Sequence, residues 1–128
     1  MLSIPTRSER TSLSKLRLGV LKLEIEAGRK NGLDRSERKC KICKSDQVEN
    51  EAHFLFVCEP LNTTRETYLN QLFDKCPTLS MVSHPDKLMY LYFNENISPN
   101  ELSIATKMLT SLINVRDKIL TDGINIVQ

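Results

Sequence analysis

The segment from residue 39 to residue 58 reads KCKICKSDQVENEAHFLFVC and contains three of the four cysteines of this 128-residue chain. Within it, Cys40, Cys43, His53 and Cys58 follow the spacing C-x2-C-x9-H-x4-C. A C-x2-C turn lets two thiolates approach one tetrahedral ion, and a short helix behind the turn supplies an imidazole and a third thiolate. Three sulfur donors and one imidazole favour Zn²⁺ over cations that prefer oxygen ligands. We therefore predict that Zn²⁺ binds these four residues, with no coordination position left for a substrate.

Other interpretations of the cysteines stay open at this point. Four cysteines can form two disulfides in an exported protein, or the spacing can arise by chance. Residues 1–10 lack the apolar segment of a secretory signal, and no apolar run approaches the ~20 residues that span a bilayer. The sequence therefore predicts an intracellular protein of the nucleus or cytoplasm, with no membrane partner. Cys76 stands outside the spacing, and we expect it to be a small thiol rather than a ligand.

Charged residues surround the predicted ligands. Arg38, Lys39, Lys41 and Lys44 flank the first cysteine pair, and we expect these cations to lower the pKa of the thiols and to offset the negative charge of a three-thiolate site. Glu49 and Glu51 flank the N-terminus of the expected helix that carries His53. The helix macrodipole favours acids at that position, so capping explains them without catalysis.

The rest of the chain predicts a mainly α, small helical domain organised around this zinc knuckle at residues 40–58. Residues 1–10 show no apolar period and read as a mobile lead-in, residues 11–122 as a single helical domain, and residues 123–128 as a tail. Leu13, Leu16, Val20 and Leu23 form a helical stripe, although the alternation Leu16, Leu18, Val20 is also compatible with a strand. We expect two short helices separated near Gly19, the first capped by Thr11 or Ser12. Further helices are expected over residues 49–58, 63–76, 87–93 and from Ser98 to Gly123.

Charge is distributed unevenly along the chain. Residues 1–46 carry twelve Lys/Arg and six Asp/Glu, whereas residues 47–128 carry six and ten, so the two parts have net charges of +6 and −4. A basic N-terminal third is typical of a surface that meets a polyanion, and an ordinary solvated surface has the same composition.

Residues 11–70 resemble the cysteine-rich, zinc-binding C-terminal region of non-LTR retrotransposon reverse transcriptases. That family shows a Leu-Arg-x-Gly element, a later Gly-Arg pair, an arginine before C-x2-C, an acidic stretch leading to a histidine, and a final cysteine followed by an arginine-containing helix. The matching positions are Leu16, Arg17 and Gly19, then Gly28 and Arg29, then Arg38, Cys40 and Cys43, then Glu49, Glu51 and His53, and finally Cys58 and Arg65.

The resemblance implies a module that grips template RNA or target DNA behind a polymerase. The chain has no pair of adjacent catalytic aspartates and is far too short for a polymerase, so it resembles a detached C-terminal fragment or a relic reading frame. No phosphate-binding glycine loop, G-x-S-x-G, HExxH or deaminase signature is present. We expect a protein that is not an enzyme and has no small-molecule substrate.

Two functions from different classes follow. The first is a zinc-dependent module that binds RNA or DNA mainly through phosphates, with Arg17, Arg29, Lys30, Arg38, Lys39, Lys41 and Lys44 as the predicted contacts. Phe54 and Phe56 are expected in the core rather than as base-stacking platforms. The second is a structural module in which Zn²⁺ staples a helical domain and the acidic C-terminal half contacts a protein partner.

Overall fold

A computed structural model describes the backbone of residues 5–126 and the side chains of residues 5–122. The main helices are α1 (Arg7–Leu18), α2 (Glu24–Lys30), α3 (Asn62–Lys75), α4 (His84–Tyr92) and α5 (Pro99–Ile126). Four short helical turns connect them, η1 (Arg35–Glu37), η2 (His53–Val57), η3 (Glu59–Leu61) and η4 (Pro77–Met81). The β pairing within residues 5–126 is a single antiparallel bridge between Lys39 and Val48. The prediction of a small, mainly α domain is therefore confirmed.

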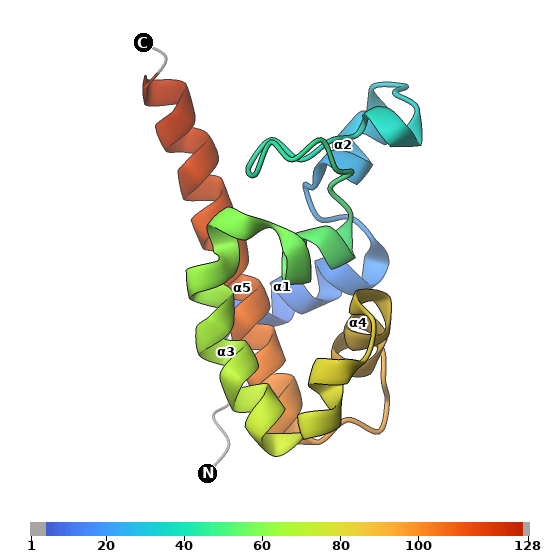
Figure 1. The fold of residues 1–128 in the computed structure, drawn as a ribbon, viewed down its shortest axis with the longest axis vertical. Coiled ribbons are helices and arrows are strands. Elements are labelled where there is room, and N and C mark those ends of the chain that lie inside the picture. Colours follow the sequence, from blue (N-terminus) through green and yellow to red (C-terminus); the bar gives the residue numbers. More distant parts are fainter. Residues whose placement is uncertain (1–4, 127–128) are drawn as a thin grey trace.

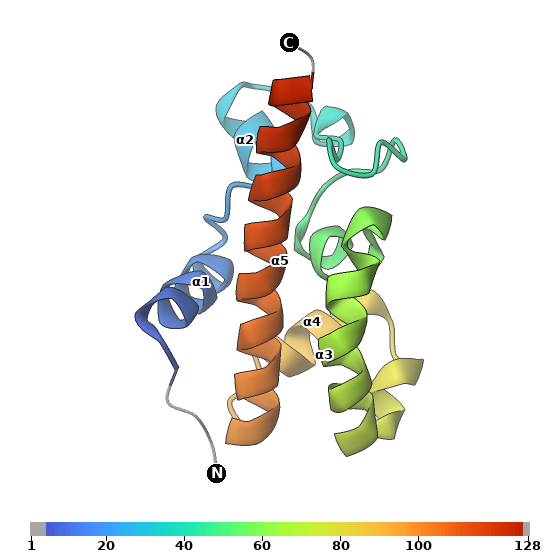
Figure 2. The same cartoon turned by 90° about the vertical axis from the view of Figure 1, so that its left-hand side faces the viewer.

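Helix α5 forms the centre of the fold (Figure 1). It packs between α1 on one side and α3 on the other, and Figure 2 shows these three helices separately. The inward face of α5 carries Ala105, Met108, Leu109 and Leu112, which are 0% exposed. These positions recur at steps of three and four residues, which is the period of one buried helix face. Within the described residues, no helix combines the length and apolar character needed to cross a membrane.

Helix α1 begins at Arg7, so the expected mobile lead-in over residues 1–10 is wrong for residues 7–10. The Thr6 side chain accepts a hydrogen bond from the Glu9 backbone N–H, and the Glu9 carboxylate accepts one from the Thr6 N–H, both at 3.1 Å. This reciprocal capping box satisfies backbone donors that the first helical turn leaves unpaired. The cap is therefore Thr6 rather than Thr11 or Ser12. Residues 1–4 lie outside the described residues.

The break near Gly19 is confirmed, and the strand alternative over residues 16–20 is wrong. Gly19 ends α1 with φ 69°, a left-handed conformation in which its N–H bonds back to the carbonyl of Leu16. Glycine adopts this conformation without the steric cost of a Cβ atom. The chain then leaves the helix and buries Leu21 and Leu23 before α2 begins.

The remaining helices confirm the expected elements but differ at their ends. Helix α3 continues directly from the turn η3 and has no side-chain cap. Ser83 caps α4, and Pro99 begins α5. Helix α5 runs through Gly123 to Ile126, which overturns the expected end at Gly123 and most of the predicted tail; residues 127–128 lie outside the described residues. Glycine costs only ~1 kcal/mol inside a helix and does not oblige it to stop.

Gly28 is required by a close approach between α2 and the loop before the first cysteine pair. A Cβ atom at position 28 would lie 2.4 Å from Cγ of Arg38. Arg38 cannot withdraw freely, because its guanidinium donates hydrogen bonds to the carbonyls of Leu33 and Ile25.

Replacement of Gly28 by alanine is therefore expected to lower the free energy of unfolding by about 1–3 kcal/mol, the usual cost of overpacking. Denaturant unfolding of the metal-loaded protein measures this change. Because the clash is with the Arg38 side chain, Gly28→Ala and Arg38→Ala together should destabilise less than the sum of the two single variants. Strict additivity of the two effects would contradict the proposed contact.

Candidate metal centre

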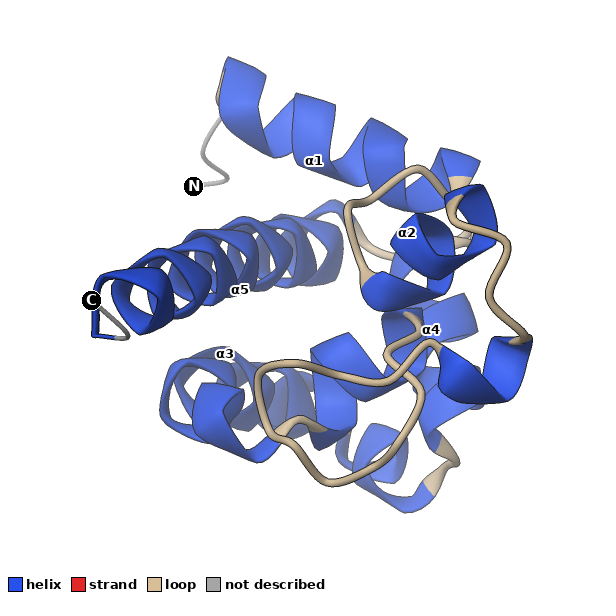
Figure 3. Cartoon of the chain, turned by 90° about the horizontal axis from the view of Figure 1, so that it is seen from above, coloured by secondary structure: helices blue, strands red, loops and turns tan. Residues whose placement is uncertain are grey.

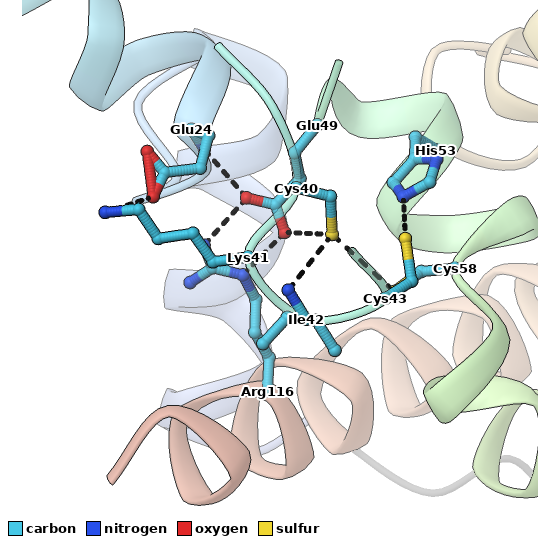
Figure 4. Close-up of polar contacts among 9 residues, drawn as sticks. All are labelled: Glu24, Cys40, Lys41, Ile42, Cys43, Glu49, His53, Cys58 and Arg116. Atoms are coloured by element: carbon cyan, nitrogen blue, oxygen red, sulfur yellow. Dashed lines mark hydrogen bonds and ion pairs between the residues drawn. The ribbon is translucent and has the colours of Figure 1, made fainter. Parts of the chain in front are cut away.

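The structure brings the four predicted ligands together. One ligand atom from each of Cys40, Cys43, His53 and Cys58 lies within 4.8 Å of all the others. The Sγ atoms of Cys40 and Cys58 are 3.8 Å apart, and Cys43 Sγ lies 3.4 Å from His53 Nε2 (Figure 4). Zn–S bonds of about 2.3 Å and Zn–N bonds of about 2.0 Å in a tetrahedron place sulfur atoms about 3.8 Å apart and sulfur and nitrogen about 3.6 Å apart. The group can therefore hold one metal ion.

His53 and Cys58 face the same point because the turn between them is wider than an α-helical turn. Five steps of an α-helix rotate a side chain by about 140° from its starting direction, which would separate the two ligands. In η2 the Cys58 N–H donates instead to the carbonyl of His53, five residues earlier, at 2.8 Å. Such a π turn brings residues five apart onto one side of the helix. The expected short helix at residues 49–58 is thus confirmed, with a π turn where the ligands lie.

The other two ligands come from a loop whose two arms are joined by backbone hydrogen bonds. The Cys40 N–H donates to the carbonyl of Gln47 at 2.8 Å, and the Glu49 N–H donates to the carbonyl of Arg38 at 3.0 Å. Between these pairs the chain reverses through Lys44 and Asp46, which have φ values of 53° and 69°. The Ile42 N–H points at Cys40 Sγ at 3.4 Å. The loop therefore presents both cysteines toward η2.

Burial, rather than the surrounding cations, dominates the thiol electrostatics. Cys40 and Cys58 are 4% and 1% exposed, and burial raises the pKa of both thiols. The expectation that the cations flanking the first cysteine pair lower the pKa of the thiols is therefore wrong for these two cysteines. Burial acts in the same direction on Cys43, but hydrogen bonds from Ser45 and the neighbouring thiols outweigh it and lower the pKa of Cys43. Burial lowers the pKa of His53, which favours the neutral ring that metals bind.

Arg65 is a buried cation directly behind the ligand helix. It is 2% exposed, and its guanidinium donates hydrogen bonds to the carbonyls of Leu55 at 2.6 Å, Cys58 at 2.9 Å and Phe54 at 3.1 Å. These carbonyls belong to the π turn and its end, where ordinary helical partners are missing. Arg65 therefore fixes the backbone that carries His53 and Cys58, and it places one positive charge beside a site with three thiolates.

Glu49 is a second buried group that contacts the centre. Its carboxylate is 0% exposed and accepts two hydrogen bonds from Arg116 of α5, at 2.7 and 2.8 Å, while its Oε2 lies 3.9 Å from Cys40 Sγ. Glu49 also accepts hydrogen bonds at the start of α2, from the Glu24 N–H to its side chain and from the Ile25 N–H to its backbone carbonyl. The expectation that Glu49 caps its own helix is wrong, because it caps α2 and pairs with α5 (Figure 4).

Most of the predicted nucleic-acid contacts already have partners within the chain. Arg17 donates to the carbonyl of Tyr92, and Arg38 holds the carbonyls of Leu33 and Ile25. Three others form ion pairs with carboxylates, Arg29 with Glu26, Lys39 with Asp46 and Lys41 with Glu24. Lys30 and Lys44 are exposed and make no ion pair in the part of the chain that the structure describes. Lys39 therefore pairs within the loop, and Arg38 and Lys41 join the loop to α2.

Residues left outside the predicted ligand set also lie outside the cluster. Cys76 follows α3, and its thiol lies 3.5 Å from Thr78 Oγ1. His84 begins α4, and its ring stacks on that of Phe56 with centroids 5.9 Å apart. Phe54 and Phe56 are 0% and 8% exposed, so both belong to the core as expected.

Comparisons with models of known protein families, with curated proteins and with solved structures find no match to this chain. The functional assignment therefore rests on the geometry of the four ligands and on the surfaces around them.

Proposed function

We propose that this chain is a non-catalytic module whose fold is held by one structural Zn²⁺ bound to Cys40, Cys43, His53 and Cys58. The observation that carries the proposal is the 3.8 Å separation of the Cys40 and Cys58 sulfur atoms beside the Cys43–His53 pair. Three thiolates and one imidazole are a common ligand set of structural zinc sites, which are closed by four protein ligands. The ion supplies a cross-link between the loop and η2, while Arg65 offsets the excess negative charge.

Metal analysis of the purified protein tests this proposal. We expect one zinc per chain and three thiols that react with a thiol reagent only after chelation, leaving Cys76 as the thiol that reacts beforehand. Native mass spectrometry checks the stoichiometry, and His53→Ala should lower zinc occupancy. A protein that is folded, metal-free and reactive at all four cysteines would contradict the assignment.

We propose further that the zinc-stabilised domain binds RNA or DNA through phosphate contacts. The net charge of +6 over residues 1–46 supports this proposal. The resemblance of residues 11–70 to the C-terminal region of retroelement reverse transcriptases also supports it. Because phosphates carry no base information, we expect little sequence preference.

Binding of labelled oligonucleotides is expected to weaken steeply as salt rises. Each phosphate contact releases counterions and contributes about 0.7 to the slope of log affinity against log salt for a single strand and about 0.9 for a duplex. Fluorescence anisotropy of the zinc-loaded protein from about 25 to 200 mM salt measures this slope. Failure to bind at the lowest salt would contradict nucleic-acid binding while leaving the zinc assignment intact.

A protein-interaction module is the second candidate function. Met81 of η4 and Met89 of α4 are 84% and 55% exposed, and Phe93 after α4 is 40% exposed. Exposed methionines are common on surfaces that bind other proteins. A zinc-loaded domain without affinity for oligonucleotides would favour this function.

A further inference from the structure

A cleft lies between α1 and α5, and neither the four proposed metal ligands nor the seven predicted contact residues line it. Its cavity volume is about 530 Å³, within the range of ~300–1,000 Å³ of pockets that hold ligands. Helix α1, the segment from Val20 to Leu23 and the face of α5 near Ile113 line it. Helix α1 packs against α5, and Figure 3 shows the two helices from above.

Several cations line this cleft. Arg7, Lys15 and Lys22 line it, are exposed, and form no ion pair within residues 5–126. Arg116 also lines it but is already paired with Glu49, and Asp117 contributes the one carboxylate among the lining residues. Hydroxyl groups of α1 add neutral donors, from Ser8, Thr11 and Ser12. The lining therefore favours an anion.

The spacing of the cations fits an extended anion better than a single one. Arg7 and Lys15 are eight residues apart on one helix, which is about 12 Å along its axis. Along the axis of duplex DNA the charges of one strand recur about every 3.4 Å, so this length corresponds to roughly three or four phosphates of a duplex. Lys22 lies beyond the end of α1 and adds a further cation to the same cleft.

The apolar part of the lining argues against a peptide helix as the occupant. Such a helix needs accessible apolar pockets for its anchoring side chains. Leu21, Leu23 and Phe54 are 6%, 2% and 0% exposed, so the protein's own packing already covers them. Val20, at 48% exposure, offers apolar contact to a sugar or base but no pocket.

We infer that this cleft binds the sugar–phosphate backbone of one nucleic-acid strand, with Arg7, Lys15 and Lys22 as its phosphate contacts. The inference rests on the proposed nucleic-acid binding. It places the main phosphate contacts on α1 and the segment after it rather than on the cations of residues 38–49, the metal loop. Recognition through phosphates here implies a strand of either RNA or DNA. Single-stranded and duplex oligonucleotides are the two sources of such a backbone, and both enter the test.

Two matched double variants test the cleft. Lys15→Gln with Lys22→Gln removes two cleft cations, and Lys30→Gln with Lys44→Gln removes two exposed cations near the metal loop, so both lose the same net charge. All four side chains are exposed, and zinc content with thermal unfolding checks that both variants are folded. Anisotropy titrations use labelled oligouridine, its duplex with oligoadenine, and labelled polyglutamate as the acidic peptide.

We expect the cleft variant to bind the oligonucleotides at least about tenfold more weakly at low salt, with a salt slope lower by about 1.4 for the single strand. The loop variant should keep the wild-type slope. The inference is overturned if the loop variant loses affinity and the cleft variant does not, and the proposed function then still stands. If the wild type binds polyglutamate as tightly as the oligonucleotides, and the cleft variant loses this binding, the inference is overturned in favour of an acidic peptide. If the wild type binds no oligonucleotide at low salt, the proposed nucleic-acid binding itself fails.

Discussion

Chelation of the metal is expected to remove most of the amide-exchange protection of residues 38–58 while α3 and α5 keep much of theirs. Two backbone hydrogen bonds, which together make the isolated bridge between Lys39 and Val48, join the arms of the loop that carries Cys40 and Cys43. Apparent binding free energies of structural zinc are ~10–16 kcal/mol, which matches or exceeds the ~5–15 kcal/mol net stability of a domain. The loop therefore depends on the ion far more than the helices that pack through buried leucines.

Hydrogen exchange followed by mass spectrometry, before and after a strong chelator, measures this difference. Cys58→Ser should reproduce the effect of chelation, because it removes one of the four proposed ligands. Cys76→Ser is the matched control, since that thiol lies outside the cluster and should leave the protection of residues 38–58 unchanged. Protection of the loop that survives both chelation and Cys58→Ser would show that no ion holds it.

The ligand set could be predicted because it is a local pattern. The spacing of Cys40, Cys43, His53 and Cys58 is contained in 19 consecutive positions and imposes its own chemistry. The helices could also be predicted from the sequence, since the apolar residues in α3 and α5 repeat at the helical period. The capping box at Thr6 is also local, with glutamate three residues later, but apolar periodicity alone does not detect it.

The groups that support the ligands could not be paired from the sequence. Arg65 lies seven residues before Leu72 and Arg116 four residues after Leu112, so both cations occur on otherwise apolar faces. An arginine on an apolar helix face is predicted to be buried, but its partner is not predicted. The partner of Arg116 is Glu49, 67 residues away in the chain. Likewise, the pairing of Lys41 with Glu24 depends on how α2 packs against the metal loop, which no spacing encodes.

Replacement of Glu49 by glutamine is expected to lower the free energy of unfolding by about 3–5 kcal/mol, the usual cost of leaving one partner of a buried ion pair alone. The side chains of Arg116 and Glu49 are 7% and 0% exposed. Burial alone would lower the pKa of Arg116, but its hydrogen bonds and ion pair with Glu49 outweigh burial and raise it. Glutamine keeps the shape of the residue and one acceptor for the Glu24 N–H, so the loss reports the missing charge.

Because Glu49 joins the metal loop, α2 and α5, the same variant should also weaken zinc binding by loosening the loop, even though the Glu49 charge raises the pKa of the Cys40 thiol. Denaturant unfolding and competition with a zinc chelator measure the two effects. Glu51→Gln, two positions along the chain, is the control for loss of a carboxylate. Adding Arg116→Met to Glu49→Gln removes the uncompensated cation and should recover part of the stability, but not the zinc affinity. If the double variant is as unstable as the sum of the single ones, the pair does not act as a unit and α5 is not coupled to the metal centre through it.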